Sequence, residues 1–204
     1  NQHILSDNLI TYIQDTLDKG EQILILHNRR GFASLKVCNS SDEVLKCHDC
    51  DVVLTFHANL NQLICHYCNQ KHSFDKYNNQ DIQLLGYGTE QLEIILNEIF
   101  PNAGILRMDV DSANSMSKQQ AILNKFQNRE CSILLGTQMI AKGLDFNNVT
   151  LVAIVNTDLG MLIPDFKSHE KMFQLISQVI GRSGRSNKIG HAVIQTYHPN
   201  NSII

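Results

Sequence analysis

The sequence predicts an α/β fold in which helices cover both faces of a parallel sheet and a small cysteine-rich segment is inserted. Three observations lead to this prediction. Short apolar runs alternate with segments whose apolar residues recur at helical spacing, which is typical of a parallel sheet flanked by helices. Between about residues 37 and 82 this pattern gives way to cysteine, histidine and asparagine. Finally, four of the six cysteines form two C-x-x-C pairs, an arrangement that favours a metal site over disulfides.

Composition is that of an ordinary globular protein. The chain has 204 residues, of which 43% are hydrophobic and 18% are charged. No apolar run reaches membrane-spanning length and no signal peptide opens the sequence, so we expect a cytoplasmic, reducing location. A net charge of -3 argues against a broadly basic, DNA-coating surface, so any nucleic-acid contact is expected to be local. Because the sequence lacks a starting methionine, we expect it to be a fragment of a longer protein.

The first expected elements are a helix and a buried strand. Ser6 can cap the helix and Gly20 can end it. Its apolar face consists of Leu9, Ile10, Ile13 and Leu17. The apolar run Gln22–His27 predicts a buried parallel strand. Arg29 and Arg30 follow that strand at its carboxyl end, where open α/β sheets bind ligands. They are therefore candidate contacts to phosphate or DNA, and the alternative is that they are ordinary surface arginines.

The insertion carries the spacing of a zinc ribbon. The pairs C-H-D-C and C-H-Y-C are separated by residues 51–64. Four thiolates suit tetrahedral Zn²⁺, and a complete quartet makes the site structural rather than catalytic. The predicted ligands of one structural zinc ion are Cys47, Cys50, Cys65 and Cys68. With the quartet complete, four nearby histidines are expected at the surface: His48, His57, His66 and His72.

After the insertion, strands and helices alternate again. The expected strands are Ile82–Leu85, 104–108, 131–135, 150–156 and 191–196. Helices are expected where Thr89 and Ser117 can act as caps and over 169–180. In the loop after the strand 104–108, Asp109 and Asp111 are expected to be turn formers. Alternation of this kind predicts a parallel sheet with helices on both faces.

Two motifs in the second half carry residues suited to phosphate. Gln178–Arg185 reads Q-V-I-G-R-S-G-R, and the planar fork of arginine donates paired hydrogen bonds to phosphate oxygens. The glycines allow the backbone to approach a ligand closely. Gly136–Gly143 reads G-T-Q-M-I-A-K-G and follows a buried apolar run. Taken alone, the first motif can be a solvated helix end and the second a strand-to-helix turn.

Together these residues resemble motifs VI and V of superfamily-two helicases. Gly86–Gln91 (G-Y-G-T-E-Q) and 158–166 (D-L-G, then P-D-F) extend the likeness to one family, the PriA (primosomal protein N′) replication-restart helicases. The resemblance covers about Ile23 to Pro199. It implies a RecA-like second helicase lobe that begins at 1–36, is interrupted by a zinc-binding insertion at 37–82 and continues over 83–204.

A P-loop is absent from this sequence. No G-x-x-x-x-G-K-[ST] motif occurs, and no acidic cluster for Mg²⁺ follows a strand, Asp158 being the nearest candidate. A helicase needs both to hold the β- and γ-phosphates. In the resembled family these parts belong to the first motor lobe, which the resemblance places upstream of residue 1. ATP and Mg²⁺ are therefore expected cofactors of the full-length protein, and this chain alone is expected to be inactive.

The resemblance also implies residue roles. Arg182 and Arg185 would stabilise charge on the γ-phosphate, with Arg185 as the arginine finger, Gln178 would help to sense nucleotide, and Asp145 would link DNA to nucleotide state. The implied DNA contacts are Gly136, Thr137, Lys142, Gly88, Thr89 and Gln91. The implied activity is 3′-to-5′ movement on one DNA strand in replication restart. Implied partners are single-stranded and forked DNA, other primosome and single-strand-binding proteins, and the upstream lobe.

Two other functions remain open from the sequence. One is a zinc-ribbon module that recruits other proteins without motor activity, and the other is a superfamily-two motor that acts on RNA. The pair Arg182 and Arg185 argues against the first alternative, because a docking module does not need an arginine pair. The cysteine-rich insertion argues against the second, by resemblance alone.

The resemblance further predicts one zinc ion where the family has two. The family's outer cysteine pairs are reduced here to Cys38, because Ser41 replaces one thiol and the last pair falls near Phe74 and Tyr77. A serine hydroxyl and aromatic rings do not hold zinc against water. Burial of the two rings is expected to replace the second metal as a clamp. The alternative is a second site that Cys38 completes with one of three histidines: His48, His66 or His72.

Overall fold

The computed structural model describes residues 4–27, 33–37, 45–52, 54–57, 61–65, 67–77, 82–85, 88–109, 112–141, 146–155, 157, 168–181, 188–196 and 199–200. The chain divides into two compact units. The first unit comprises Asn1–Arg30 and Leu92–Ile204, and the second comprises Gly31–Gln91. The predicted insertion 37–82 lies within the second unit. The division into an insertion at 37–82 and a helicase lobe made of 1–36 and 83–204 stays a prediction.

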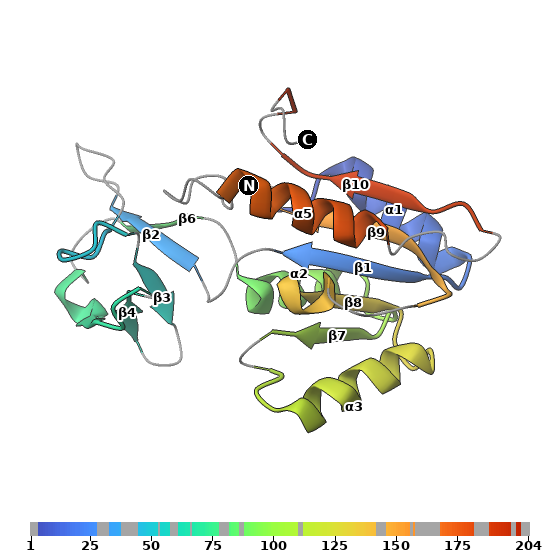
Figure 1. Ribbon diagram of the computed structural model, residues 1–204, viewed down its shortest axis with the longest axis horizontal. Coiled ribbons are helices and arrows are strands. Elements are labelled where there is room, and N and C mark those ends of the chain that lie inside the picture. The colour runs from blue at the N-terminus through green and yellow to red at the C-terminus, as the bar shows by residue number, and fades with distance from the viewer. Residues whose placement is uncertain are drawn as a thin grey trace. The chain divides into compact units, whose positions relative to one another are not determined.

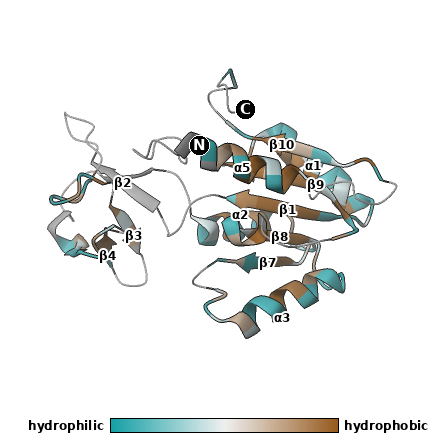
Figure 2. Ribbon diagram, viewed as in Figure 1, coloured by the Kyte–Doolittle hydropathy of each residue, from teal (hydrophilic) through white to brown (hydrophobic). Residues whose placement is uncertain are grey.

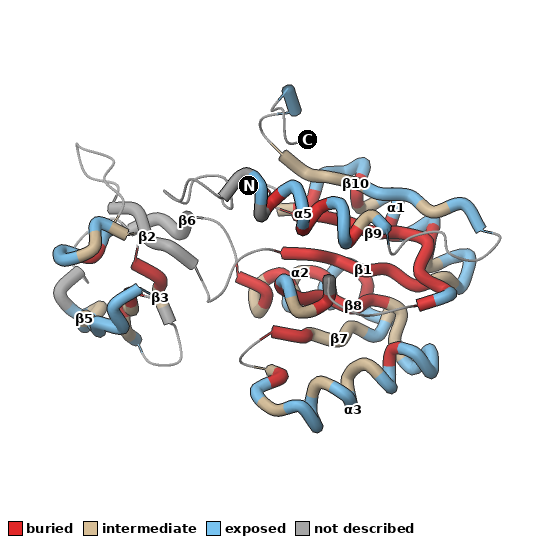
Figure 3. Tube along the Cα trace, in the orientation of Figure 1, coloured by how far each residue is buried: buried red, intermediate tan, exposed pale blue. Residues whose placement is uncertain are grey.

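A parallel sheet forms the centre of the first unit (Figure 1). Its five strands are ordered β10-β9-β1-β8-β7, and each described pairing between them is parallel. The strands are β1 (Gln22–His27), β7 (Ile105–Met108), β8 (Ile133–Gly136), β9 (Val149–Val155) and β10 (His191–Ile194). The three central strands are buried along their whole length, as the continuous red tube in Figure 3 shows. Burial on both faces explains why these strands have continuous apolar sequences.

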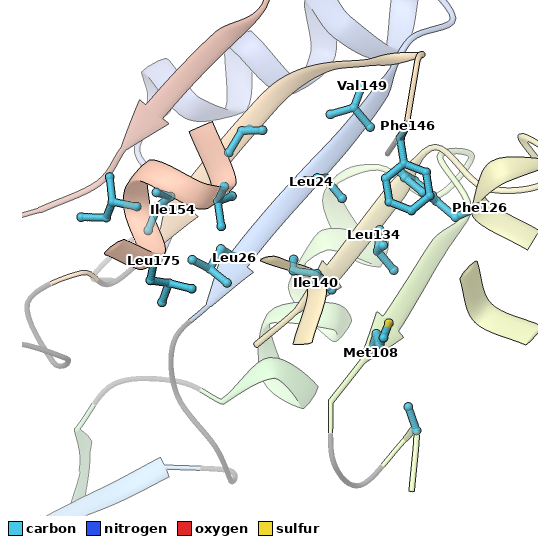
Figure 4. Close-up of a cluster of buried hydrophobic side chains, with 14 of the residues drawn as sticks. Leu24, Leu26, Met108, Phe126, Leu134, Ile140, Phe146, Val149, Ile154 and Leu175 are labelled. Carbon is cyan, nitrogen blue, oxygen red and sulfur yellow. The ribbon is translucent and has the colours of Figure 1, made fainter. Parts of the chain in front are cut away.

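Helices cover both faces of this sheet, which confirms the predicted fold class. They are α1 (Asp7–Asp18), α2 (Thr89–Ile99), α3 (Met116–Gln127) and α5 (Ser168–Ile180). Alternate residues of β1 enter different cores: Leu24 and Leu26 pack with α3 and α5, while Ile23 and Ile25 pack with α1 and α2. Figure 4 shows the first of these cores, and the apolar strands are visible in Figure 2. In the described residues, no helix is long and apolar enough to cross a membrane.

The helix ends follow capping rules, with corrections to the sequence prediction at two helices. Thr89, predicted as the cap of α2, is instead its first helical residue. The Ser6 side chain accepts a hydrogen bond from the N–H of Leu9, and Gly20 beyond α1 has φ +66°, as predicted. The third helix, however, begins at Met116 with Ser115 as its cap, not Ser117. Either serine suits a cap, and the two hydroxyls lie 3.1 Å apart, so the local sequence could not separate them.

The second unit has an antiparallel sheet of short strands. Its order is β5-β4-β3-β2-β6, formed by Lys71–Ser73, Gln62–Ile64, Thr55–His57, Ala33–Val37 and Ile82–Leu85. A 3₁₀ helix, η2, covers Phe74–Tyr77. The predicted strand Ile82–Leu85 exists as β6, but it pairs with β2 here instead of continuing the parallel sheet. The described core of the unit is small, and two of its four buried residues are cysteines: Cys47, Leu54, Leu63 and Cys65.

Candidate functional site

The two C-x-x-C segments of the second unit form turns with the same backbone hydrogen bonds. In the first, the N–H of Asp51 donates to the carbonyl of Cys47 at 2.9 Å, and the N–H of Cys47 donates to Val52 at 2.8 Å. In the second, Asn69 donates to Cys65 at 2.8 Å, and Cys65 donates to Gln70 at 2.9 Å. The repeated pattern turns both cysteines of each pair towards one point.

A left-handed residue completes each turn. Asp51 has φ 52° and Asn69 has φ 60°, a region that Asp and Asn tolerate better than most residues. Each follows the second cysteine of its pair directly. The choice of Asp and Asn at these two positions therefore reflects the backbone geometry of the turn, and neither residue is needed as a ligand.

The four sulfur atoms lie at the separation of a tetrahedral metal site. All four lie within 4.8 Å of one another, and the sulfurs of Cys47 and Cys68 are 3.7 Å apart. Four thiolates about 2.3 Å from one Zn²⁺ would lie about 3.8 Å apart. Within the described part of the chain, this cluster is the group of side chains that could hold a metal ion. Cys47 and Cys65 are buried, whereas Cys68 is exposed.

The thiols differ in their pKa because their surroundings differ. The hydrogen bond between Cys50 and Cys68 raises the pKa of Cys50 to about 12. Burial raises the pKa of Cys65, but backbone N–H groups of Cys68 and Tyr67, together with neighbouring thiols, lower it to about 7. N–H groups aimed at a sulfur stabilise its thiolate, which is the form that binds metal. Cys65 is thus the thiol of the cluster that ionises most readily, whereas Cys50 needs a bound cation to favour its thiolate.

A polar contact joins the two turns beside the sulfurs. The side-chain amide nitrogen of Gln70 donates to the carboxylate of Asp49, and the amide oxygen of Gln70 lies 3.7 Å from the sulfur of Cys47. Gln70 belongs to the second turn, whereas Asp49 and Cys47 belong to the first. The hydrogen bond between Gln70 and Asp49 therefore links the two turns beside the sulfurs.

The candidates for a second metal site do not form a cluster in the described residues. The side chain of His48 is 97% exposed, as predicted. His72 on β5 was also predicted at the surface, but it is half-buried, and its Nε2 is buried without a hydrogen-bond partner in the described structure. Phe74 packs on Phe56 with ring centroids 4.6 Å apart. Other members of the predicted outer site lie outside the described residues: Cys38, Ser41, His66 and the side chain of Tyr77. Likewise, the side chain of His57 is not described.

In the first unit, Gly136 is the last residue of β8 and lies close to Met108 of β7 and to Ile140. A Cβ on Gly136 would overlap the carbonyl oxygen of Met108 and lie 2.6 Å from Cγ2 of Ile140. Thr137 follows, 5% exposed, and its N–H points to the same carbonyl of Met108 at 3.4 Å. A 3₁₀ helix, η3 (Gln138–Ala141), continues the motif. Close packing between strands is therefore one reason for this glycine.

We expect Gly136→Ala to lower the free energy of unfolding by about 1–3 kcal/mol, because the new methyl group has no room. Urea denaturation followed by circular dichroism would measure the change. Gly181→Ala is the matched control, since a Cβ there lies 3.4 Å from the nearest atom, the carbonyl oxygen of Ser177. Equal stability of the two variants would contradict the packing explanation for Gly136.

Helix α5 presents Gln178 to solvent. Met172, Leu175, Ile176 and Val179 are buried on its opposite face. The N–H of Gly181 donates to the carbonyl of Ser177 at 3.1 Å and prolongs the helix by one residue. Both arginines of the motif lie outside the described residues, as do several other predicted positions: Arg182, Arg185, Lys142, Asp145, Asp158, Arg29 and Arg30.

The predicted DNA contacts at the start of α2 are not fully exposed. Gly88 is buried and Thr89 is 3% exposed, while Gln91 is half-buried with its side-chain oxygen buried and unpartnered in the described structure. The structure therefore brings together the four cysteines among the predicted site residues. It leaves the nucleotide and DNA contacts as predictions.

Sequence reasoning missed a polar cluster at the amino ends of the strands. Lys188 forms an ion pair of 3.0 Å with Glu21, which also accepts a 2.6 Å hydrogen bond from the hydroxyl of Thr150. Lys188 donates to Asn148 as well, at 3.3 Å. These residues are far apart in the sequence, so no local pattern could have indicated the contact.

The chain is similar to helicase proteins. It matches the family described as helicase conserved C-terminal domain over residues 48–187. A curated relative, the replication restart protein PriA of Bacillus subtilis (strain 168), is 41% identical over 203 residues, which cover 98% of this chain and 25% of that protein. The replication restart protein PriA of Chlamydia trachomatis serovar D is 42% identical over 205 residues, or 98% of this chain and 27% of that protein.

Among solved structures, the Pyrococcus furiosus Hef helicase domain gives a TM-score of 0.43 at 16% identity, covering 96% of this chain and 26% of that chain. The chain spans about a quarter of the length of the two curated relatives.

Proposed function

Since the chain belongs to the helicase conserved C-terminal domain family, we propose that it is the second motor lobe of an ATP-dependent 3′-to-5′ DNA helicase that acts in replication restart and primosome assembly. One observation carries the proposal: the chain contains both a helicase conserved C-terminal domain and a cluster of four cysteines, and it is 41% identical to a replication restart protein. The parallel sheet with helices on both faces supports this proposal, because a two-lobed helicase works by moving two lobes of this fold against each other.

Site roles follow from the two motifs. Arg185 acts as arginine finger on the γ-phosphate, Arg182 shares that charge, and Gln178 and Asp145 respond to nucleotide. The exposed position of Gln178 on α5 supports this role. The proposed contacts to DNA phosphates are Gly136, Thr137, Lys142, Gly88, Thr89, Gln91, Arg29 and Arg30. Since Thr89 and Thr137 are buried here, contact through their hydroxyls needs a local rearrangement on DNA binding.

The metal in the cysteine cluster is proposed to be one structural Zn²⁺ held by Cys47, Cys50, Cys65 and Cys68. Four thiolates leave no open position for water, so its role is to hold the two turns together. ATP and Mg²⁺ act in the full-length protein, where the upstream lobe supplies the P-loop. Proposed partners are single-stranded and forked DNA and other primosome and single-strand-binding proteins, in the cytoplasm.

We expect this chain alone not to hydrolyse ATP. Arg182 and Arg185 can stabilise a transition state, but a phosphate-binding loop is needed to hold the nucleotide, and the sequence has none. Phosphate release measured with and without single-stranded DNA tests this expectation. Turnover at a rate typical of full-length motors would show that the chain carries a complete nucleotide site.

We also expect one zinc ion per chain. The cysteine quartet binds one metal, and Cys38 stays a free thiol because it lacks partner thiols at Ser41, Phe74 and Tyr77. Elemental analysis combined with alkylation of the native protein measures both. Cys38 should be alkylated, while the quartet is protected. Two zinc ions per chain would establish the alternative second site instead.

A further inference from the structure

The four cysteines of the cluster differ in how far solvent reaches them. Cys47 and Cys65 are buried, and Cys50 is half-buried. Cys68, by contrast, is exposed, and the side chain of Tyr67 beside it is 79% exposed. A molecule dissolved in water therefore reaches the cluster most easily at Cys68.

Exposure decides which of the four sulfurs reacts first, because binding of a metal makes them alike in charge. A thiol that ligates a metal ion is deprotonated, so each ligand of the proposed zinc site is a thiolate, whatever its pKa without metal. The thiolate is the form of cysteine that reacts with oxidants. Because a metal ion shares the electron pair with which a thiolate attacks, all four ligands react more slowly than a free thiolate. Access from solvent then selects Cys68 among them.

A buried sulfur of the other turn lies close to that of Cys68. The sulfurs of Cys47 and Cys68 are 3.7 Å apart, which is near van der Waals contact, and the burial of Cys47 keeps it from meeting an oxidant directly. Within the second turn, the sulfur of Cys65 accepts hydrogen bonds from the backbone N–H groups of Cys68 and Tyr67. Such hydrogen bonds lower the nucleophilicity of a thiolate. A disulfide from Cys68 is therefore expected to join the two turns through Cys47.

We propose that Cys68 is an oxidation site at which hydrogen peroxide acts on the second unit, and that Cys47 completes a disulfide with it. This inference rests on the proposed zinc site. In the first step, the sulfur of Cys68 attacks one oxygen of the peroxide, the O–O bond breaks and hydroxide leaves, so Cys68 becomes a sulfenic acid. In the second step, the thiolate of Cys47 attacks the sulfur of Cys68, the S–S bond forms and a second hydroxide leaves. The two sulfurs lose two electrons in total, and the peroxide gains them.

Formation of this disulfide removes two of the four ligands from the metal site. Two remaining thiolates are too few for a structural zinc site, so the metal is released. Cys47 and Cys65 form half of the described buried core of the second unit, so loss of the metal opens the unit. A thiol reductant can reverse the disulfide by exchange and restore all four ligands. The second unit is therefore a redox-sensitive element, closed with metal when reduced and open when oxidised.

The test treats the full-length protein, purified with its metal, with substoichiometric hydrogen peroxide. Dimedone traps sulfenic acids, and peptide mass spectrometry then identifies the labelled cysteine. We expect the label on Cys68 and, without dimedone, a disulfide between Cys47 and Cys68 that forms at the same rate as a chromogenic chelator records released zinc. Within the quartet, a label on Cys50 before Cys68 would overturn the inference, and so would a disulfide that joins Cys68 to Cys65 or to Cys50.

Histidine substitutions separate metal binding from oxidation. Cys68→His keeps a zinc ligand, because three cysteines and one histidine form a structural zinc site, but it removes the exposed sulfur. We expect peroxide to release zinc from this variant about tenfold more slowly than from wild type. Cys50→His is the matched control, since it makes the same change at a half-buried ligand and should release zinc within about threefold of the wild-type rate. Equal rates for the two variants would overturn the inference, and if either variant fails to hold zinc, the labelling of the wild-type protein decides.

Failure of the proposed zinc site looks different. In that case, elemental analysis of the untreated full-length protein would find no zinc, and the role of Cys68 would fall with the site. If the untreated protein contains zinc and peroxide releases it without modifying Cys68, only the oxidation inference is wrong.

Discussion

Replacement of Arg185 by alanine is expected to lower DNA-stimulated ATP turnover of the full-length protein by about 10³-fold or more, as loss of an arginine finger does. In the proposed role, the guanidinium group of Arg185 stabilises charge that develops on the γ-phosphate in the transition state. Turnover under saturating ATP and single-stranded DNA measures the effect, and the melting temperature should change little. This result would also exclude a zinc-ribbon module without motor activity.

Two further variants make the interpretation of Arg185→Ala specific. Arg185→Lys retains a positive charge but loses the planar fork, so we expect it to recover little of the activity. Arg129→Ala removes an arginine from an exposed position after α3 and should leave turnover unchanged. Turnover by Arg185→Ala within a few-fold of wild type would assign the arginine a structural role.

Removal of the metal is expected to unfold the second unit and leave the first folded. The proposed metal ligands Cys47 and Cys65 form half of the buried core of the second unit, beside Leu54 and Leu63. Structural zinc contributes about 10–16 kcal/mol in zinc-finger peptides, which is more than so small a core can replace. Hydrogen exchange after treatment with a chelator should show loss of protection at the N–H groups of Cys47 and Cys65 and at the strands β3 to β5.

Cysteine substitutions provide the matched comparison. Cys65→Ser should reproduce the effect of the chelator, because serine is a poor zinc ligand. Cys131→Ser should keep both metal and protection, because Cys131 lies in the first unit, outside the cluster. Protection that persists in the metal-free protein would mean that the second unit folds without metal.

Sequence reasoning succeeded where local patterns determine structure. The strands β1, β8 and β9 were predicted to within two residues at each end, because strands buried on both faces have continuous apolar sequences. The cluster of four cysteines was predicted, because C-x-x-C spacing places both sulfurs of a pair on one side of a turn.

The rest depended on contacts between distant residues. β6 has the same apolar character as a strand of the parallel sheet, and only its pairing with β2 assigns it to the second unit. The strands β3 to β5 have three residues each, too few to show a period. The contact of Lys188 with Glu21 joins opposite ends of the sequence. The start of α3 at Met116 depended on a choice between two equally suitable serines.

The pairing of β2 with β6 has an evolutionary consequence. These strands are the first and last of the second unit, and they run antiparallel with Ser34 opposite Leu85. The chain therefore leaves and returns at neighbouring points, which is the geometry that allows one domain to be inserted into another. Closing such a gap costs little loop entropy. A unit inserted in this way can change in sequence and length without altering the strand register of the parallel sheet.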